Sequence, residues 1–103
     1  MTDEEIEKTP YFAVIPANVR YDDKLSATSK LLLVDIINIC WKSDDCVCRV
    51  SNKAFAKLYG TTTSTITRWL KPLKEGNYIK IDYGHKMPAQ RIIRLGEALR
   101  RHE

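Results

Sequence analysis

The middle of the chain holds two helix-type segments joined by a short turn with a glycine, and this feature limits the possible folds more than any other. Ala56 is small enough to let two helices cross closely, and Gly60 is free to take a positive φ at a helix end. Thr62 can cap the next helix, and Ile66 can pack that helix onto the first. The spacing from Ala56 to Arg68 therefore predicts a helix-turn-helix unit.

We expect the first helix of this unit over residues 52–59, after Ser51 as N-cap, with Ala54, Phe55 and Leu58 as its apolar face. The second helix is expected over about 63–74. Its buried stripe consists of Ile66, Trp69, Leu70 and Leu73. Pro72 removes the hydrogen bond to the Arg68 carbonyl, so we expect the helix to bend or end there.

A third helix, more hydrophobic than the other two, is expected over residues 27–42 with Ser26 as its N-cap. Its apolar residues surround most of the helix: Leu31, Leu32, Leu33, Val34, Ile36, Ile37, Ile39 and Cys40. Such a broad apolar surface is typical of a helix that neighbours bury on several sides. We therefore expect this helix at the centre of the core.

Four short segments have the composition of strands. Residues 46–50 follow a Ser-Asp-Asp turn, and residues 78–83 and 90–95 flank a polar, Pro-containing tip at 84–89, which predicts a β-hairpin. Tyr11 to Ile15, stopped by Pro16, predicts an edge strand that pairs with its own sheet or forms a homodimer seam. The expected fold class is α+β: a winged helix-turn-helix with a three-helix core, a β-hairpin wing and a short N-terminal edge strand.

The 103 residues suffice for a single domain. We expect a flexible acidic tail over residues 1–10, the winged helix-turn-helix domain over 11–95, and a short C-terminal helix or tail over 96–103. No apolar stretch is long enough to span a membrane, and the acidic N-terminus is unlike a secretory signal. These features predict a cytoplasmic protein.

Charge is distributed unevenly along the chain. Residues 1–25 hold three basic and six acidic residues, whereas residues 49–101 hold twelve Lys or Arg and three Asp or Glu. This imbalance is typical of a surface that binds a polyphosphate, although a merely solvated basic surface would have the same composition.

The predicted inner stripe of the second helix leaves hydroxyl and basic side chains on its outer face. Short hydroxyl side chains can approach DNA closely, the forked guanidinium of Arg68 suits guanine, and Lys71 suits a phosphate. Basic residues of the preceding helix and of the hairpin can reach the backbone or the minor groove. The predicted DNA-binding residues are Lys53, Lys57, Thr62, Thr63, Ser64, Thr67, Arg68, Lys71, His85, Lys86 and Arg91.

Catalytic and metal sites are not indicated. Two histidines, scattered carboxylates and no phosphate-cradling glycine loop predict no enzymatic activity and no cofactor. Cys40, Cys46 and Cys48 are expected to be reduced thiols. A zinc site completed by His85 is a weak alternative, because the C-x5-C-x-C spacing lacks a second close pair of ligands.

Several stretches of the sequence also resemble a known family, over roughly residues 11–95. They are Tyr11-Phe12-Ala13-Val14-Ile15-Pro16-Ala17, Leu25-Ser26-x3-Lys30-Leu31-Leu32, Ser51-Asn52-x2-Phe55-Ala56 and Gly60-x4-Thr65-Ile66-x-Arg68-Trp69-Leu70-x2-Leu73-x2-Gly76-x2-Ile79. The chain resembles the N-terminal winged-helix domain of plasmid replication initiators and phage replisome organisers, including the DnaD-like group. It departs from them at Thr61, where an aliphatic residue is usual. Residues 1–103 contain no counterpart of the family's C-terminal effector part, so we expect either a domain of a longer protein or a small stand-alone protein.

The resemblance implies binding to repeated or palindromic origin sites, often as a dimer. We therefore expect sequence-specific binding of double-stranded DNA in replication initiation of a plasmid, phage or mobile element. The helix at 63–74 would enter the major groove, and the wing at 84–91 would contact flanking backbone or the minor groove. Two alternatives remain: a transcriptional repressor of the same fold, and a protein-interaction module that binds a host helicase loader or another replication factor.

Overall fold

The computed structural model describes residues 16–83 and 91–100, which form an α+β fold. This part of the chain contains five helices and a three-stranded antiparallel sheet. The elements in chain order are α2 (Ala17–Arg20), α3 (Ala27–Lys42), β1 (Val47–Cys48), α4 (Asn52–Tyr59), α5 (Thr63–Glu75), β2 (Ile79–Tyr83), β3 (Arg91–Leu95) and α6 (Glu97–Arg100).

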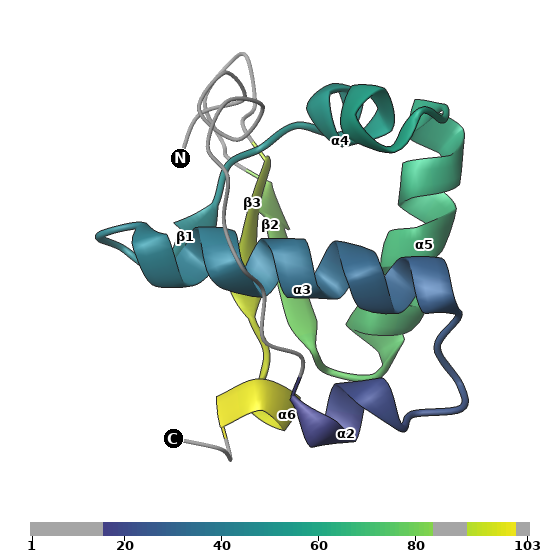
Figure 1. Cartoon of the computed structure of the whole chain (residues 1–103). Helices are drawn as coiled ribbons and strands as arrows, with labels where there is room; N and C mark the ends of the chain where they lie inside the picture. Colours follow the sequence, from purple (N-terminus) through teal and green to yellow (C-terminus); the bar gives the residue numbers. More distant parts are fainter. Residues whose placement is uncertain (1–15, 84–90, 101–103) are drawn as a thin grey trace.

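Helix α3 crosses the middle of the molecule, in front of the sheet in Figure 1, and its bounds are those expected from the sequence. The Ser26 hydroxyl accepts a hydrogen bond from the Ser29 amide at 3.1 Å, which confirms the predicted N-cap. Nine of the sixteen residues of α3 are buried, so it is the central core helix. The prediction for Leu31 was wrong, because its side chain is 53% exposed on a side of α3 that faces solvent.

The sheet has the strand order β1-β3-β2. Strand β3 is central, and its Ile93 pairs with Cys48 on one side and with Ile81 on the other. Ile93 is fully buried against the helical core. Strand β1 has two residues and is shorter than the predicted 46–50, because Cys46 takes a φ of 58° in the preceding turn.

Helices α4 and α5 are joined by the predicted turn, and α4 has the predicted bounds. Leu58 was expected on the buried face of α4 but is 42% exposed, and Ala56 is buried in its place. Pro72 does not end α5, which continues to Glu75. Proline removes one hydrogen bond, and the adjacent Leu73 is fully buried, so packing holds the last turn.

The short helix α2 was not predicted from the sequence. Four residues give too few positions for a periodic pattern, and Val19 is its one buried residue. Helix α6 lies within the segment where a short C-terminal helix was expected. The expected acidic tail, the edge strand Tyr11 to Ile15, and the hairpin tip at 84–89 lie outside the described residues.

Tyr78 connects the two short helices to the sheet. Its hydroxyl donates to Asp22 Oδ2 at 2.7 Å and lies 3.3 Å from the Asn18 carbonyl oxygen, while Asn18 Nδ2 donates to the Ala98 carbonyl oxygen at 3.1 Å. Gly96 lies close by, and a Cβ atom there would sit 2.0 Å from the Asn77 carbonyl oxygen. This close approach therefore requires glycine. The cluster closes the end of the sheet that Figure 1 shows beside α2 and α6.

The bond between Tyr78 and Asp22 should make stability depend on pH. The Tyr78 hydroxyl holds the pKa of Asp22 below its ordinary value of 3.8, so this contribution is complete above that pH and is lost as the pH falls through the lowered pKa. We expect Tyr78→Phe to lower the free energy of unfolding by about 1 kcal/mol near neutral pH. The difference from wild type should shrink between about pH 5 and pH 2.

Urea unfolding at a series of pH values measures this difference. Tyr21→Phe is the matched control, because Tyr21 is exposed and its hydroxyl has no hydrogen-bond partner in residues 16–83 and 91–100. A loss for Tyr78→Phe that is the same at every pH would contradict the assigned role of the Asp22 carboxylate.

Candidate nucleic-acid interface

Three local features define the start of α4 and the turn between α4 and α5. The Ser51 hydroxyl caps α4 by accepting from the Ala54 amide at 3.0 Å, and the Thr62 hydroxyl caps α5 by accepting from the Thr65 amide at 3.2 Å. Between them, Gly60 takes the left-handed conformation with a φ of 65°. Gly60 and the Thr62 cap thus end α4 and start α5 within three residues, which limits the angle between the two helices.

The core holds the inner side of α5. Ile66 and Leu73 are fully buried, and Leu70 is 4% exposed. Trp69 is half-buried, and its ring meets that of Tyr59 edge to face with centroids 5.9 Å apart. The Trp69 carbonyl oxygen accepts from the Ser29 hydroxyl at 2.9 Å, which ties α5 to α3.

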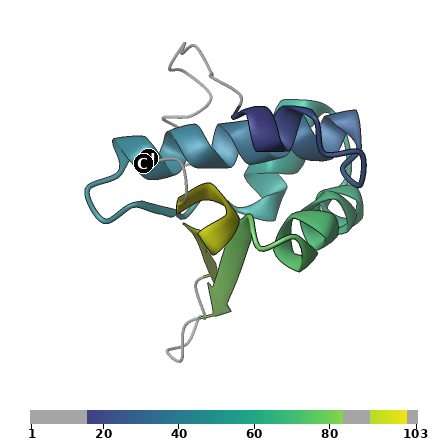
Figure 2. The same cartoon turned by 90° about the horizontal axis from the view of Figure 1, so that it is seen from below.

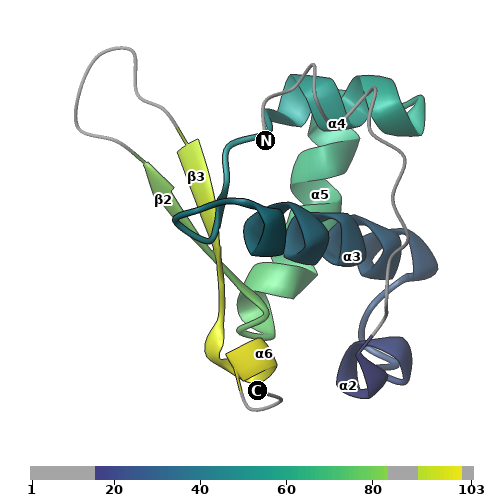
Figure 3. The ribbon, with the colours of Figure 1, turned by 60° about the vertical axis from the view of Figure 1, so that its left-hand side comes forward.

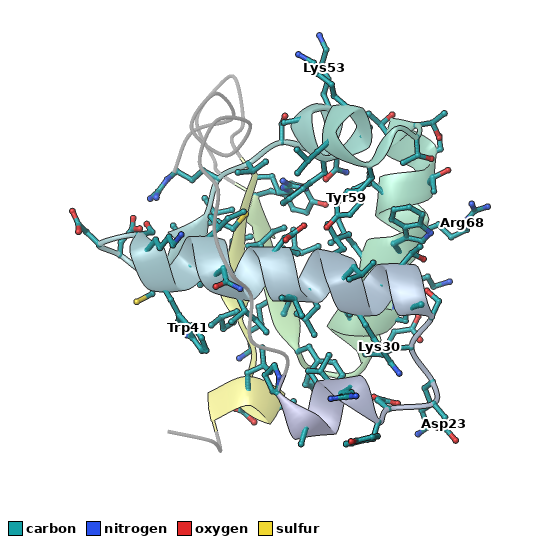
Figure 4. The ribbon with its side chains drawn as sticks, in the orientation of Figure 1. Asp23, Lys30, Trp41, Lys53, Tyr59 and Arg68 are labelled. Atoms are coloured by element: carbon teal, nitrogen blue, oxygen red, sulfur yellow. The ribbon has the colours of Figure 1, made fainter. Side chains whose placement is uncertain are left out.

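Side chains that were predicted to face DNA occupy the outer side of α5. All five are exposed: Thr63, Ser64, Thr67, Arg68 and Lys71. Figure 4 shows Arg68 pointing away from the helix into solvent. The Arg68 guanidinium lies 3.5 Å from Thr65 Oγ1, and neither Arg68 nor Lys71 forms an ion pair with any residue of the described segments. The structure therefore brings these five side chains together on one helix surface.

Residues of α4 extend this surface. Lys53 and Lys57 are both exposed, and Figure 4 shows Lys53 pointing outward from α4. Thr62 is also exposed, but its hydroxyl is engaged as the cap of α5 and lies 3.0 Å from Thr65 Oγ1. Thr62 therefore acts as the N-cap of α5, at a position where the sequence also predicted a DNA contact.

The sequence predicted that Arg91 of the hairpin contacts DNA, but in the structure its side chain bonds to other residues of the protein. The Arg91 guanidinium is half-buried and donates to Asn52 Oδ1 and to the Val50 carbonyl oxygen. Arg94, which is exposed, donates to Asp82 Oδ2 at 3.0 Å. His85 and Lys86 lie outside the described residues. Arg91 is therefore engaged within the protein rather than presented at the surface.

Basic residues outnumber acidic residues in the helix pair and the hairpin strands. Helices α4 and α5 with strands β2 and β3 carry eight Lys or Arg and two Asp or Glu. Figure 2 shows α5 and the β2–β3 hairpin on the same side of α3. A phosphate backbone is the kind of ligand that such a charge balance attracts.

The cysteines offer no competing site within the described residues. All three are free, and no group of three His, Cys, Asp or Glu side chains in those segments could hold a metal ion. The Cys40 thiol is buried and lies 3.7 Å from the Ile93 carbonyl oxygen, and burial raises its pKa to about 12. Cys40 is therefore a protonated core residue and a poor nucleophile.

Asn52 and Tyr83 were not among the predicted site residues. Asn52 bonds Arg91 and also donates from Nδ2 to Thr67 Oγ1 at 3.3 Å. Tyr83, which is 66% exposed, pairs with Arg91 across the hairpin and so shares its sheet face. The β-type pattern of residues 78–83 could have indicated that Tyr83 lies at the end of a hairpin strand. No local pattern indicates Asn52, because its partner is 39 residues away in the sequence.

Comparison with known proteins gives no further assignment: no family model, no curated protein and no solved structure matches the chain. No helix in residues 16–83 and 91–100 is long and apolar enough to cross a membrane.

The conformation of Gly60 can be tested directly. A Cβ atom at this position would meet no other atom within 4 Å, so a substitution there changes backbone conformational energy alone. We expect Gly60→Ala to lower the free energy of unfolding by about 1 kcal/mol, because L-residues disfavour the left-handed region. Gly60→Asn should lose less, because asparagine tolerates that region. Urea unfolding followed by circular dichroism measures both, and equal losses for the two variants would contradict the expectation.

Proposed function

We propose that this chain is a winged helix-turn-helix domain that binds double-stranded DNA in a sequence-specific manner. The element order supports this proposal. A core helix and a strand, α3 and β1, precede the helix pair α4 and α5, and the hairpin β2–β3 follows, with β3 between the other two strands. In the proposed fold, α5 is the recognition helix and the hairpin is the wing.

One observation carries the proposal: the exposed side of α5 combines hydroxyl and basic side chains and contains no acidic residue from Thr63 to Lys74. Thr63 and Ser64 lie in the first turn, where short side chains permit close approach to a groove. Arg68 and Lys71 follow one and two turns later along the helix. A helix of this width fits the major groove of B-form DNA.

The side chains suggest a division of tasks. The Arg68 fork matches the two acceptors of guanine, and Lys71 supplies a point charge for a phosphate. Lys53 and Lys57 are exposed on α4, and we propose that they contact the backbone beside the groove, as the first helix of such a motif does. No step of this mechanism changes a covalent bond, and we propose no enzymatic activity.

We further propose a role in replication initiation of a plasmid, phage or mobile element, in which repeated sites would be bound. This part of the proposal is supported by the resemblance of residues 11–95 to the winged-helix domains of replication initiators and replisome organisers. A repressor of the same fold is the alternative within DNA binding. A module that binds a host replication factor is the alternative outside it.

Selection of bound fragments from a random DNA pool separates these alternatives. Regularly spaced repeats of one short site favour an initiator over a repressor. Failure to enrich any site at low salt would contradict sequence-specific DNA binding and favour the interaction module. A pull-down with host replication proteins would then identify the partner.

Two single variants test the proposed recognition helix. Lys71→Ala should weaken binding to all sequences and reduce the slope of log K against log salt by about 1, because one phosphate contact is lost. Arg68→Ala should lose about 1–3 kcal/mol of binding free energy on the preferred site and relax preference at one base pair. Fluorescence anisotropy at several salt concentrations measures both effects.

Lys42→Ala combined with Arg49→Ala is the matched control. This pair also removes one Lys and one Arg, but from the end of α3 and the segment after β1, and Figure 1 shows this end of the molecule far from α5. Its effect on affinity should be small. Binding that ignores salt and survives the loss of both Arg68 and Lys71 would exclude the proposed mechanism.

A further inference from the structure

Three polar side chains form a continuous hydrogen-bonded chain from the hairpin to α5. Arg91, the first residue of β3, donates from Nη1 to Asn52 Oδ1 and from Nη2 to the Val50 carbonyl oxygen. Asn52, the first residue of α4, donates from Nδ2 to Thr67 Oγ1 at 3.3 Å. The Thr67 hydroxyl in turn donates to the Thr63 carbonyl oxygen at 3.1 Å. Figure 3 shows the hairpin, α4 and α5 that these contacts connect.

The chemistry of these groups fixes the direction of every bond in the chain. A guanidinium has donors only, so Arg91 must meet the amide oxygen of Asn52. The amide nitrogen of Asn52 therefore faces Thr67, whose oxygen must accept. Because a hydroxyl has one proton, and Thr67 directs it to the Thr63 carbonyl oxygen, Thr67 has only acceptor capacity left for a further partner.

Burial decreases along this series of hydrogen bonds, from Arg91 to Thr67. Arg91 and Asn52 are half-buried, whereas Thr67 is exposed on α5. The bond between Arg91 and Asn52 is thus partly shielded from water, which strengthens it relative to an exposed bond. The outer end lies on the surface that we propose as the recognition face.

We propose that Asn52 is a positioning residue that braces the β2–β3 hairpin against α5 and sets the hydrogen-bonding polarity of Thr67. The brace is independent of any ligand. Its consequence for base selection rests on the DNA-binding function proposed above. Arg91 acts through this brace and makes no contact with DNA.

The polarity of Thr67 limits which base edge it can recognise. Its oxygen can accept from the amino group of adenine or cytosine in the major groove, and its methyl group can pack on the methyl group of thymine. It has no proton to donate to a phosphate oxygen or to guanine. Thr67 therefore selects against guanine at the base that it faces.

The brace is tested by a double-mutant cycle in urea unfolding, with Asn52→Ala, Arg91→Lys and the double variant. Lysine keeps the charge but loses the fork that reaches both Asn52 and the Val50 carbonyl oxygen. We expect each single variant to lower the urea midpoint and the double variant to lower it by less than the sum of the two single shifts, because the Arg91–Asn52 bond is lost in both. Additive shifts would overturn the brace.

Two further variants keep this cycle interpretable. Lys53→Ala, at the next position of α4, removes an exposed side chain outside the chain of hydrogen bonds and should be additive with Arg91→Lys. Asn52→Asp keeps the acceptor for Arg91 and should retain a midpoint above that of Asn52→Ala. A midpoint for Asn52→Asp as low as that of Asn52→Ala would overturn the assigned bond.

The consequence for base selection is tested by random-pool selection with wild type, Thr67→Val and Asn52→Ala. Thr67→Val keeps the methyl shape and loses the acceptor, so the base position that changes in this variant is the one that Thr67 faces. Wild type should disfavour guanine there by about fivefold, the ratio that corresponds to one net hydrogen bond. Asn52→Ala should relax the same position, although Asn52 would not touch DNA.

The two arms fail separately. An unchanged base preference in Asn52→Ala would overturn the polarity assignment. If the effects of Asn52→Ala and Arg91→Lys on unfolding are not additive but the protein binds no duplex, the brace is supported and DNA binding is rejected. If the two shifts in urea midpoint are additive but the wild type enriches a DNA site, only the brace is rejected.

Discussion

The packing of the apolar side of α5 onto the core is the constraint on which the rest of the structure depends. Ile66 and Leu73 are fully buried, and the Trp69 backbone is bonded to Ser29 of α3. Because a helix has 3.6 residues per turn, burial of this side leaves Thr67 and Arg68 outward. The proposed recognition surface is therefore a consequence of core packing. A core substitution that rotates α5 would alter that surface although no residue of the surface is replaced.

Polar side chains act mainly as connectors between elements in this small fold. Tyr78 joins the segment that follows α2 to the sheet through Asp22, and the Tyr59 hydroxyl at the end of α4 donates to the Asp35 carboxylate of α3. Arg91 connects β3 to the start of α4. A domain of this size has a limited apolar core, so such directional contacts add to the specification of how the elements meet.

The same use of polar groups changes how the basic composition should be interpreted. Arg49 is paired with Asp45, whose pKa the guanidinium holds well below its usual range, and Arg94 is paired with Asp82. Together with Arg91, these arginines account for part of the basic excess that the sequence assigned to one binding surface. Among residues 16–83 and 91–100, helices α4 and α5 together carry five exposed Lys or Arg, so the exposed charge is more localised than composition suggests.

The sequence by itself determined the helices α3 and α4, because serine caps and apolar periodicity are local signals that a chain carries whatever its surroundings. It also placed Gly60 at the turn and the hydroxyl and basic side chains on one side of α5. Tertiary structure alone decided that Leu31 and Leu58 are exposed and that Arg91 turns inward to Asn52. Each of these outcomes depends on neighbours distant in sequence, and no local pattern records which neighbours a side chain will meet.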